Sequence, residues 1–280
     1  MNSMNSACLY IVATPIGNLS DISERAVQIL KQVDLIAVED TRHSGKLLQH
    51  SGVATPMQAL HEHNEAKKVE QLIELLTAGK SIALISDAGT PLISDPGYQL
   101  VKAAIDAGIK VSPVPGASAL IAALSASGLP SDAFIFEGFL PNKSASRLKK
   151  LEALADESRT LIFYEAPHRI IDCLEDMQQV FGAERVAVVA RELTKTFETI
   201  KKDSLENLLN WIKADSNQQR GEFVLLIQGQ EKAATTINAE AERILDILLQ
   251  ELPLKQASQL AARITGIKKN TLYELALNKR

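Results

Sequence analysis

Short apolar runs alternate with helical spacings along most of the chain. Eight apolar runs predict strands at residues 8–13, 35–38, 81–86, 110–114, 134–139, 160–164, 185–190 and 222–228. Between these runs, segments such as 22–33 and 69–76 place apolar side chains at the spacing of one helix face. Regular alternation of strands with amphipathic helices is typical of an α/β fold with a largely parallel sheet, which is the fold class that we predict.

Two interruptions divide this pattern into three predicted domains. Pro113, Pro115 and Gly116, followed by a stretch of small residues and Pro130, interrupt the first half of the chain. After Gly229 the strand pattern gives way to purely helical spacing. We therefore expect an N-terminal α/β domain at 1–120, a second α/β domain at 121–230 and a small helical domain at 231–280.

The helical tail predicts two helices joined by a turn. Gly266 separates two apolar faces, which consist of Ala257, Leu260, Ala261 and Ile264 and of Leu272, Leu275 and Ala276. Residues 253–280 carry six basic side chains against Glu274, a net charge of +5, whereas the whole chain carries −4 and the remainder therefore −9. Arg263, Lys268 and Lys269 are candidates for a helix-turn-helix contact with nucleic acid. A helical hairpin that packs on the body or on a partner subunit is an equally good interpretation.

Composition describes an ordinary globular chain. Of its 280 residues 46% are apolar and 23% charged, and the mean hydropathy is zero, which is typical of a soluble protein. No apolar run approaches the roughly 18 residues of a membrane span, and the first residues lack the pattern of a signal peptide. Cys8 and Cys173 lie in apolar segments, which excludes a disulfide framework. We expect a cytoplasmic protein with no membrane partner.

Three loops after predicted strands are rich in glycine, proline and small hydroxyl residues. They lie at residues 14–21, 86–97 and 114–119. In a parallel sheet all three would open at the carboxyl edge, where small residues allow a ligand to approach the main chain. Each loop by itself is also compatible with a simple tight turn. The three together predict a ligand site.

Familiar nucleotide and metal motifs are absent. The chain has neither G-x-G-x-x-G at its first helix nor G-x-x-x-x-G-K-[ST] anywhere, so a dinucleotide oxidoreductase and a P-loop NTPase lose their main support. His61, Glu62 and His63 are followed by no matching ligand cluster and are interpreted as an exposed polar turn. We predict no metal site.

Acidic and basic side chains cluster at three further predicted strand ends, residues 39–43, 165–169 and 191–195. Carboxylates at the carboxyl edge of a sheet can accept a proton, and Arg or Lys side chains there can bind phosphate. Salt bridges and helix caps are the alternative for each residue. The clustering at three strand ends favours a functional site.

Taken in order, these motifs resemble the tetrapyrrole-methylase superfamily. The resembling segments are Thr14–Asp21, Glu39–Arg42, Ser86–Gly97, Val114–Ala119, Glu165–Arg169, Arg191–Lys195 and Gly221–Val224. Within the superfamily they are similar to the ribosomal RNA small-subunit methyltransferase I family, which methylates the ribose 2′-hydroxyl of a cytidine in the decoding region of 16S rRNA. The resemblance covers residues 8–229, and the basic tail also suits that family.

This resemblance implies two α/β domains of the class III methyltransferase type, with S-adenosylmethionine in the cleft between them, and a homodimer that acts on 16S rRNA within the small ribosomal subunit. By position, the implied cofactor-binding residues are Pro15, Ile16, Gly17, Asp87, Ala88, Gly89, Thr90, Ile93, Ser118, Ala119, Tyr164, Glu165, Leu193, Phe223 and Val224. The wider superfamily has a glycine-rich first loop and Gly-Asp-Pro in the second. This chain has a single Gly17 and Gly89-Thr90-Pro91 instead, which puts a porphyrinoid substrate in doubt.

The reaction implied by the resemblance is in-line displacement, in which a ribose oxygen attacks the sulfonium methyl group. Positioning carries much of the rate of such a reaction. Candidate bases are Asp40, Glu165 and Glu192, and candidate RNA contacts outside the tail are Arg42, His168, Arg169, Arg191 and Lys195. Two alternatives stay open: a methyltransferase acting on carbon or nitrogen of a tetrapyrrole, and a non-catalytic RNA-binding protein of ribosome assembly.

Overall fold

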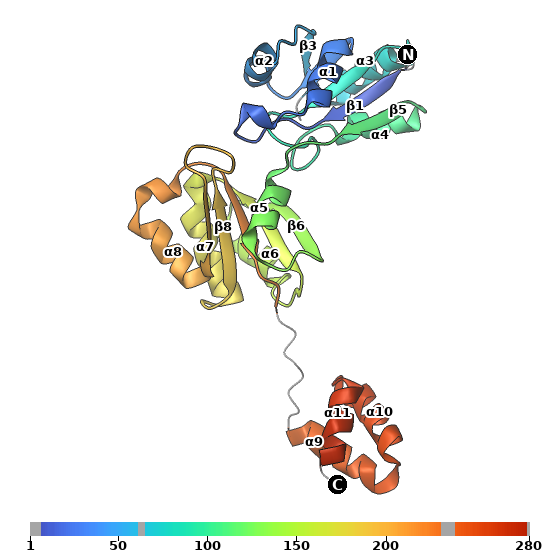
Figure 1. Cartoon of the computed structure of the whole chain (residues 1–280), viewed down its shortest axis with the longest axis vertical. Coiled ribbons are helices and arrows are strands. Elements are labelled where there is room, and N and C mark those ends of the chain that lie inside the picture. The colour runs from blue at the N-terminus through green and yellow to red at the C-terminus, as the bar shows by residue number, and fades with distance from the viewer. Residues whose placement is uncertain (1–6, 61–64, 231–238, 279–280) are drawn as a thin grey trace. The chain divides into compact units, whose positions relative to one another are not determined.

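The computed structural model describes residues 7–60, 65–230 and 239–278. Contacts divide the chain into two compact units, Met1–Gly229 and Gln230–Arg280, and each is described by itself. The first unit contains two β-sheets and the second contains helices (Figure 1). No helix within the described part of the chain is both long and apolar enough to cross a membrane.

The first sheet is entirely parallel. Its strands are β1 (Cys8–Val12), β2 (Leu35–Val38), β3 (Met57–Ala59), β4 (Ile82–Ile85) and β5 (Lys110–Val114), in the order β3-β2-β4-β1-β5. The first sheet's helices are α1 (Glu24–Gln32), α2 (Thr41–His50), α3 (Glu65–Thr77) and α4 (Tyr98–Asp106), and the short 3-10 helix η1 (Leu19–Asp21) precedes α1. Because α1 and α2 cover one face and α3 and α4 the other, the central strands are buried on both sides, as their continuous apolar sequences predict.

The second sheet is mixed. Its strands are β6 (Phe134–Phe139), β7 (Thr160–Glu165), β8 (Val186–Arg191), β9 (Thr199–Ser204) and β10 (Phe223–Ile227), in the order β6-β7-β10-β8-β9. Only β6 and β7 pair in parallel, whereas β10 is antiparallel to β7 and β8, and β9 is antiparallel to β8. The prediction of a largely parallel sheet is therefore right for the first sheet and wrong for the second. The short link from β8 to β9 forces an antiparallel pair, because a parallel crossover needs a dozen or more residues.

This topology places the start of β10 beside the ends of β7 and β8. Since β10 runs against β7 and β8, its first residue, Phe223, pairs with the last residues of those strands, Glu165 and Arg191. Helix α5 (Ala119–Ser127) covers the sheet face that carries Ile162 and Val188. The other face packs on α6 (Ser144–Glu152), α7 (Ile170–Phe181) and α8 (Leu205–Ala214). Two short 3-10 helices, η2 (Pro167–Arg169) and η3 (Ser216–Gln219), complete the unit.

The eight predicted strands all exist, and each observed end lies within one residue of its prediction. Two edge strands were missed. β3 is three residues long, too short to establish an alternation, and β9 reads Thr-Ile-Lys-Lys-Asp-Ser because an edge strand favours polar and charged side chains. The predicted boundary at residue 120 falls inside α5, whose buried Leu120, Ala123 and Leu124 pack with the second sheet.

The second unit is a three-helix cluster of α9 (Ala239–Glu251), α10 (Leu254–Thr265) and α11 (Lys269–Asn278). Its core includes Leu245, Ala261 and Leu272. The predicted helix, turn and helix correspond to α10, Gly266 and α11, and Gly266 ends α10 in the left-handed conformation that glycine adopts at little cost. Ile264, predicted on the same apolar face as Ala257 and Ala261, is 57% exposed, whereas those two residues are buried.

Candidate active site

The three predicted loops meet at the carboxyl ends of the neighbouring strands β4, β1 and β5. Thr14 N donates to Gly89 O at 2.8 Å, and Gly89 N returns a hydrogen bond to Thr14 O at 3.1 Å. Thr90 Oγ1 donates to Ala117 O at 3.0 Å and so joins the β4 loop to the β5 loop. The expected shared edge is therefore present, and backbone hydrogen bonds fix the loops against one another.

The β1 loop also packs against the second sheet. Ile16 belongs to the same apolar cluster as Leu193 and Val224. A Cβ atom added to Gly17 would lie 2.5 Å from Lys195 Cγ and 2.8 Å from Leu193 O, so no larger residue fits without moving the loop after β8. Glycine at this position allows the closest approach between the two halves of the site.

A cavity of about 340 Å³ opens between these loops and the ends of β7, β8 and β10. All the cofactor residues implied by the resemblance line it except Pro15 and Gly17. Those two line an adjoining hollow of about 240 Å³, together with His43 and Lys195. The structure thus gathers residues from seven separate chain segments around one space of the size usual for small-molecule sites.

Sequence reasoning missed part of the lining. The additional lining residues are Ser94, Asp95, Phe139, Ala166, Pro167 and Glu222. Most lie within motifs already singled out, so a signal existed for them in the loop and strand-end segments. Phe139 had none, because an aromatic residue at the end of an apolar strand is indistinguishable from core; its ring in fact lies edge-on to Tyr164, with centroids 5.7 Å apart, and it is 55% exposed.

Strained backbone is concentrated at the cavity. Among the described residues, four that are not glycine have positive φ: Leu92 at 73°, Ser94 at 71°, Glu192 at 52° and Thr194 at 64°. They lie in the β4 loop and in the loop after β8, which face the cavity and the adjoining hollow. Such conformations cost energy and persist where the surrounding structure over-determines them, most often at functional sites.

Asp40, the first candidate base, caps helix α2. Its carboxylate accepts hydrogen bonds from the Arg42 backbone at 2.8 Å and from Arg42 Nη2 at 2.9 Å. These interactions with Arg42 lower the pKa of Asp40 to about 2. Asp40 lines neither hollow, although its backbone N–H donates to Asp87 Oδ1 at 3.3 Å. Its catalytic role stays a prediction.

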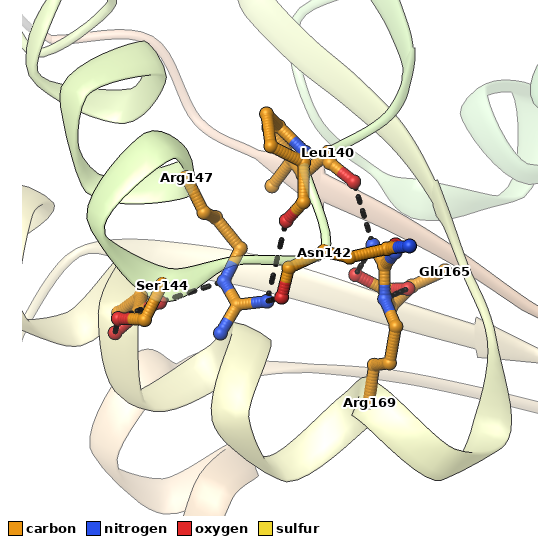
Figure 2. Close-up of polar contacts among 8 residues, drawn as sticks. Leu140, Asn142, Ser144, Arg147, Glu165 and Arg169 are labelled. Atoms are coloured by element: carbon orange, nitrogen blue, oxygen red, sulfur yellow. Dashed lines mark hydrogen bonds and ion pairs between the residues drawn. The ribbon is translucent and has the colours of Figure 1, made fainter.

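Glu165, the second candidate, lines the cavity with a fully buried side chain that is paired with Arg169. Arg169 Nη2 donates to Glu165 Oε2 at 2.9 Å and to Leu140 O at 2.7 Å, and Nη1 donates to Asn142 Oδ1. Figure 2 shows how Arg169 and Arg147 lie on either side of the segment after β6. Arg147 is buried against Asp176, with Nε 2.6 Å from Oδ2. Through Arg169, the ion pair of Glu165 therefore fixes the segment after β6 at the cavity wall.

Glu192, the third candidate, is held by Lys195. Its Oε1 accepts from Lys195 Nζ at 2.8 Å and from the Glu222 backbone N–H at 3.0 Å. Burial acts to raise the pKa of Glu192, but the bonds from Lys195 and the Glu222 backbone outweigh it, so that the pKa is lowered. A carboxylate stabilised in its charged form is a weak proton acceptor. The catalytic role of Glu192 also stays a prediction.

Asp95 differs from these three. Burial raises its pKa to about 6, opposed by a hydrogen bond from Ser86 and reinforced by the negative charges of Glu39 and Asp87. It lines the cavity, close enough to Tyr164 for its charge to raise the pKa of that phenol, which burial already raises. A carboxyl group with a raised pKa in a cavity is a candidate for proton transfer.

The predicted RNA-contacting residues differ in their exposure. Arg42, His168, Arg263 and Lys268 are exposed, Lys269 is half-buried, and Arg169 is held in its ion pair with Glu165. Arg191 is 7% exposed and donates to the carbonyls of Phe197, Asn217 and Arg220, so its guanidinium supports the loops around β8 and β10. Lys195 bridges Glu192 and Glu222 at 2.8 Å each.

No cluster of three His, Cys, Asp or Glu side chains suited to a metal ion occurs in residues 7–60, 65–230 and 239–278. His61, Glu62 and His63 lie outside the described residues.

Residues 8–209 match the family model of tetrapyrrole (corrin/porphyrin) methylases, and residues 235–280 match that of the RsmI C-terminal HTH domain. A uroporphyrin-III-C-methyltransferase from Thermus thermophilus superposes with a TM-score of 0.57 at 20% identity, over 79% of this chain and 94% of that one. The methyltransferase CobJ gives 0.60 at 18% identity, over 82% and 95%. At such identities the likeness concerns the fold.

Sequence relatives extend over the whole chain. Ribosomal RNA small subunit methyltransferase I of Pseudomonas aeruginosa is 59% identical over 279 residues, 99% of each chain. The protein of the same name from Escherichia coli O157:H7 is 55% identical over 272 residues, 97% of this chain and 95% of that one.

The fold and the site define a class III methyltransferase, the tetrapyrrole-methylase type. Its full-length relatives identify the family: the chain belongs to the ribosomal RNA small subunit methyltransferase I family. This membership confirms the fold class implied by the resemblance, which is two α/β domains of the class III methyltransferase type and a helical C-terminal domain, and it confirms the predicted cofactor S-adenosylmethionine and the predicted enzyme class.

Proposed function

We propose that this enzyme transfers a methyl group from S-adenosylmethionine to the ribose 2′-hydroxyl of a cytidine in the decoding region of 16S rRNA. The observation that carries the proposal is the 59% sequence identity to an rRNA small subunit methyltransferase over 99% of the chain. The similarity includes both the methylase unit and the helical tail. A tetrapyrrole methyltransferase does not account for that tail. We further propose a homodimer that acts in the cytoplasm on the small ribosomal subunit.

The cavity suits the cofactor. Ile16, Ile93 and Phe223 offer apolar surface to a purine, while Asp87 places negative charge near a molecule that carries a sulfonium and an ammonium group. Position 89 has a φ of 84°, a conformation that glycine adopts at little cost, so this loop can make its sharp turn at the cavity wall. We propose that the lining residues implied by the resemblance bind S-adenosylmethionine, which supplies an electrophilic methyl group.

The protein's own contribution is then positioning. Backbone hydrogen bonds between the β1 and β4 loops and the fixed β6 segment hold the cavity walls in one arrangement. Aligning a hydroxyl with the methyl group and excluding water converts a two-body encounter into a near-unimolecular step. The exposed Arg42 and His168 of the first unit and the basic residues of the second are proposed contacts for RNA phosphates.

The test is transfer of labelled methyl from S-adenosylmethionine to small ribosomal subunits from cells that lack this enzyme. Labelled positions are mapped as alkali-resistant linkages, which only 2′-O-methylation produces. We expect one such linkage in the decoding region. Label at a nucleobase, or label only on added tetrapyrroles, contradicts the proposal. Cofactor binding without transfer to any RNA supports the non-catalytic alternative instead.

A further inference from the structure

The Asp95 carboxylate is distinguished from its neighbours by what surrounds it. It lies in the β4 loop, lines the cavity, and interacts with the hydroxyl of Ser86. The charged and titratable groups that influence it are Glu39 after β2, Asp87 after β4, and Tyr164 on β7. Among the described residues, no lysine or arginine forms an ion pair with it.

The remaining cavity carboxylates are already engaged. Glu165 is paired with Arg169, and Glu222 Oε2 accepts from Lys195 Nζ at 2.8 Å. Asp87 Oδ1 accepts the backbone N–H of Asp40. Unlike Glu165 and Glu222, Asp95 has no cationic partner in the described part of the chain, and burial disfavours its negative charge, so protonation relieves an unfavourable burial.

The backbone holds Asp95 in place. Leu92 and Ser94 have positive φ, and Gly97 has a φ of 120°. A Cβ atom on Gly97 would lie 2.6 Å from Leu84 Cδ2, and one on Gly138 of β6 would lie 3.1 Å from Ser94 Oγ. The segment that carries Asp95 is thus pressed between β4 and β6. Strain of this kind is maintained where a group must be held in a fixed position.

We propose that Asp95 is the general base of the methyl transfer, accepting the proton of the attacking ribose hydroxyl. In that step a bond forms between the 2′-oxygen and the methyl carbon, and the bond between that carbon and sulfur breaks with its electron pair going to sulfur. The hydroxyl proton passes to a carboxylate oxygen of Asp95. The inference rests on the proposed function, because it names the proton acceptor for that reaction.

The electrostatics suit this role. A base works best when its pKa lies close to the working pH while its charged form still dominates. A pKa of about 6 leaves Asp95 mostly ionised at neutral pH and makes it a stronger base than an exposed aspartate. Asp40 and Glu192, whose pKa values are lowered, are poorer acceptors.

The first test compares Asp95→Asn with the unchanged enzyme in single-turnover methylation of small subunits, and measures S-adenosylmethionine affinity by calorimetry. Asp132→Asn, at an exposed position before β6, is the matched control. We expect Asp95→Asn to slow the transfer by about 10²–10⁴-fold, the usual contribution of general base catalysis, with cofactor affinity changed by less than about threefold. Asp132→Asn should leave both unchanged.

The second test is the pH dependence of the single-turnover rate. The unchanged enzyme should lose activity tenfold per pH unit below about pH 6. Glu39→Gln should move this break to lower pH, because it removes a negative charge that raises the pKa of Asp95. This measurement stands even if Asp95→Asn fails to fold.

The outcomes separate the inference from the proposed function. Full-rate transfer by Asp95→Asn, or a break that Glu39→Gln does not move, overturns the role of Asp95 alone. A loss of cofactor affinity as large as the loss of rate shows instead that Asp95 binds the cofactor, which also overturns it. If the unchanged enzyme transfers no methyl to ribose, the proposed function fails and the inference fails with it.

Discussion

Arg169 and Glu165 form an ion pair across one turn at the cavity wall, with Nε 2.8 Å from Oε1 and side-chain exposures of 13% and 0%. Because Arg169 also donates to Leu140 O, the pair connects the end of β7 to the segment after β6. It is a structural clamp on the wall that carries Phe139 and Pro167.

Replacing Arg169 with alanine should therefore destabilise the first unit. The change leaves the buried Glu165 carboxylate without its partner, which typically costs about 3–5 kcal/mol in the free energy of unfolding. Arg42→Ala removes an exposed pair to Asp40 and should have no measurable effect on stability. Chemical denaturation of both variants checks the difference, and equal stability for the two contradicts the clamp.

Gly17→Ala should weaken S-adenosylmethionine binding by at least about tenfold, a cost of about 1.4 kcal/mol. The added methyl group would collide with Leu193 O and Lys195 and push the β1 loop away from the second sheet. Gly45→Ala within α2 is the control: its methyl group would lie 3.7 Å from Met57 Cε, and alanine favours a helix by about 0.5–1 kcal/mol. Calorimetry should show weakened binding only for Gly17→Ala.

Asp95→Asn should be more stable than the unchanged protein at pH 7. The pKa of Asp95 is raised from 3.8 to about 6 in the folded state, so ionisation destabilises the fold as pH rises through that range. Allowing for solvent screening of a partly exposed group, we expect a gain of about 1–2 kcal/mol. The gain should vanish below about pH 3, where the wild-type carboxyl is protonated in both the folded and the unfolded state. Unfolding curves with a pH-independent difference contradict this reasoning.

Neutralising the basic tail should weaken binding to small ribosomal subunits while leaving cofactor affinity intact. Lys268→Gln with Lys269→Gln removes two cations from the second unit, and the slope of log affinity against log salt should fall by about 1–2. Lys31→Gln with Lys102→Gln removes the same charge from exposed positions of the first unit. If both pairs lower the slope equally, the tail has no special role in capturing RNA.

Most of the fold was accessible from sequence because buried strands such as Leu35–Val38 and Phe223–Ile227 read as unbroken apolar runs. The mixture of parallel and antiparallel pairs in the second sheet could not be predicted, since apolar runs carry no information about strand direction. The edge strand Thr199–Ser204 was hidden by its polar sequence.

The candidate site was also predictable only in part. The loops that line the cavity were found because glycine, proline and small hydroxyl residues mark them directly. The ion-pair partners of the charged residues could not be predicted. The pairs Glu165–Arg169 and Lys195–Glu222 depend on how separate segments pack. Asp95 lies inside the segment 86–97 that the sequence singles out, but the sequence does not distinguish it from its neighbours, because its raised pKa arises from burial.

The proposed 2′-O-methylation of one cytidine in 16S rRNA can be measured directly in cells. The most direct measurement is the mass-spectrometric content of 2′-O-methylcytidine in 16S rRNA from cells that lack the enzyme and are complemented with either the unchanged chain or Gly17→Ala. We expect the modified nucleoside to be absent without the enzyme, restored by the unchanged chain and reduced by Gly17→Ala. Equal amounts in every strain would show that this enzyme does not make the modification.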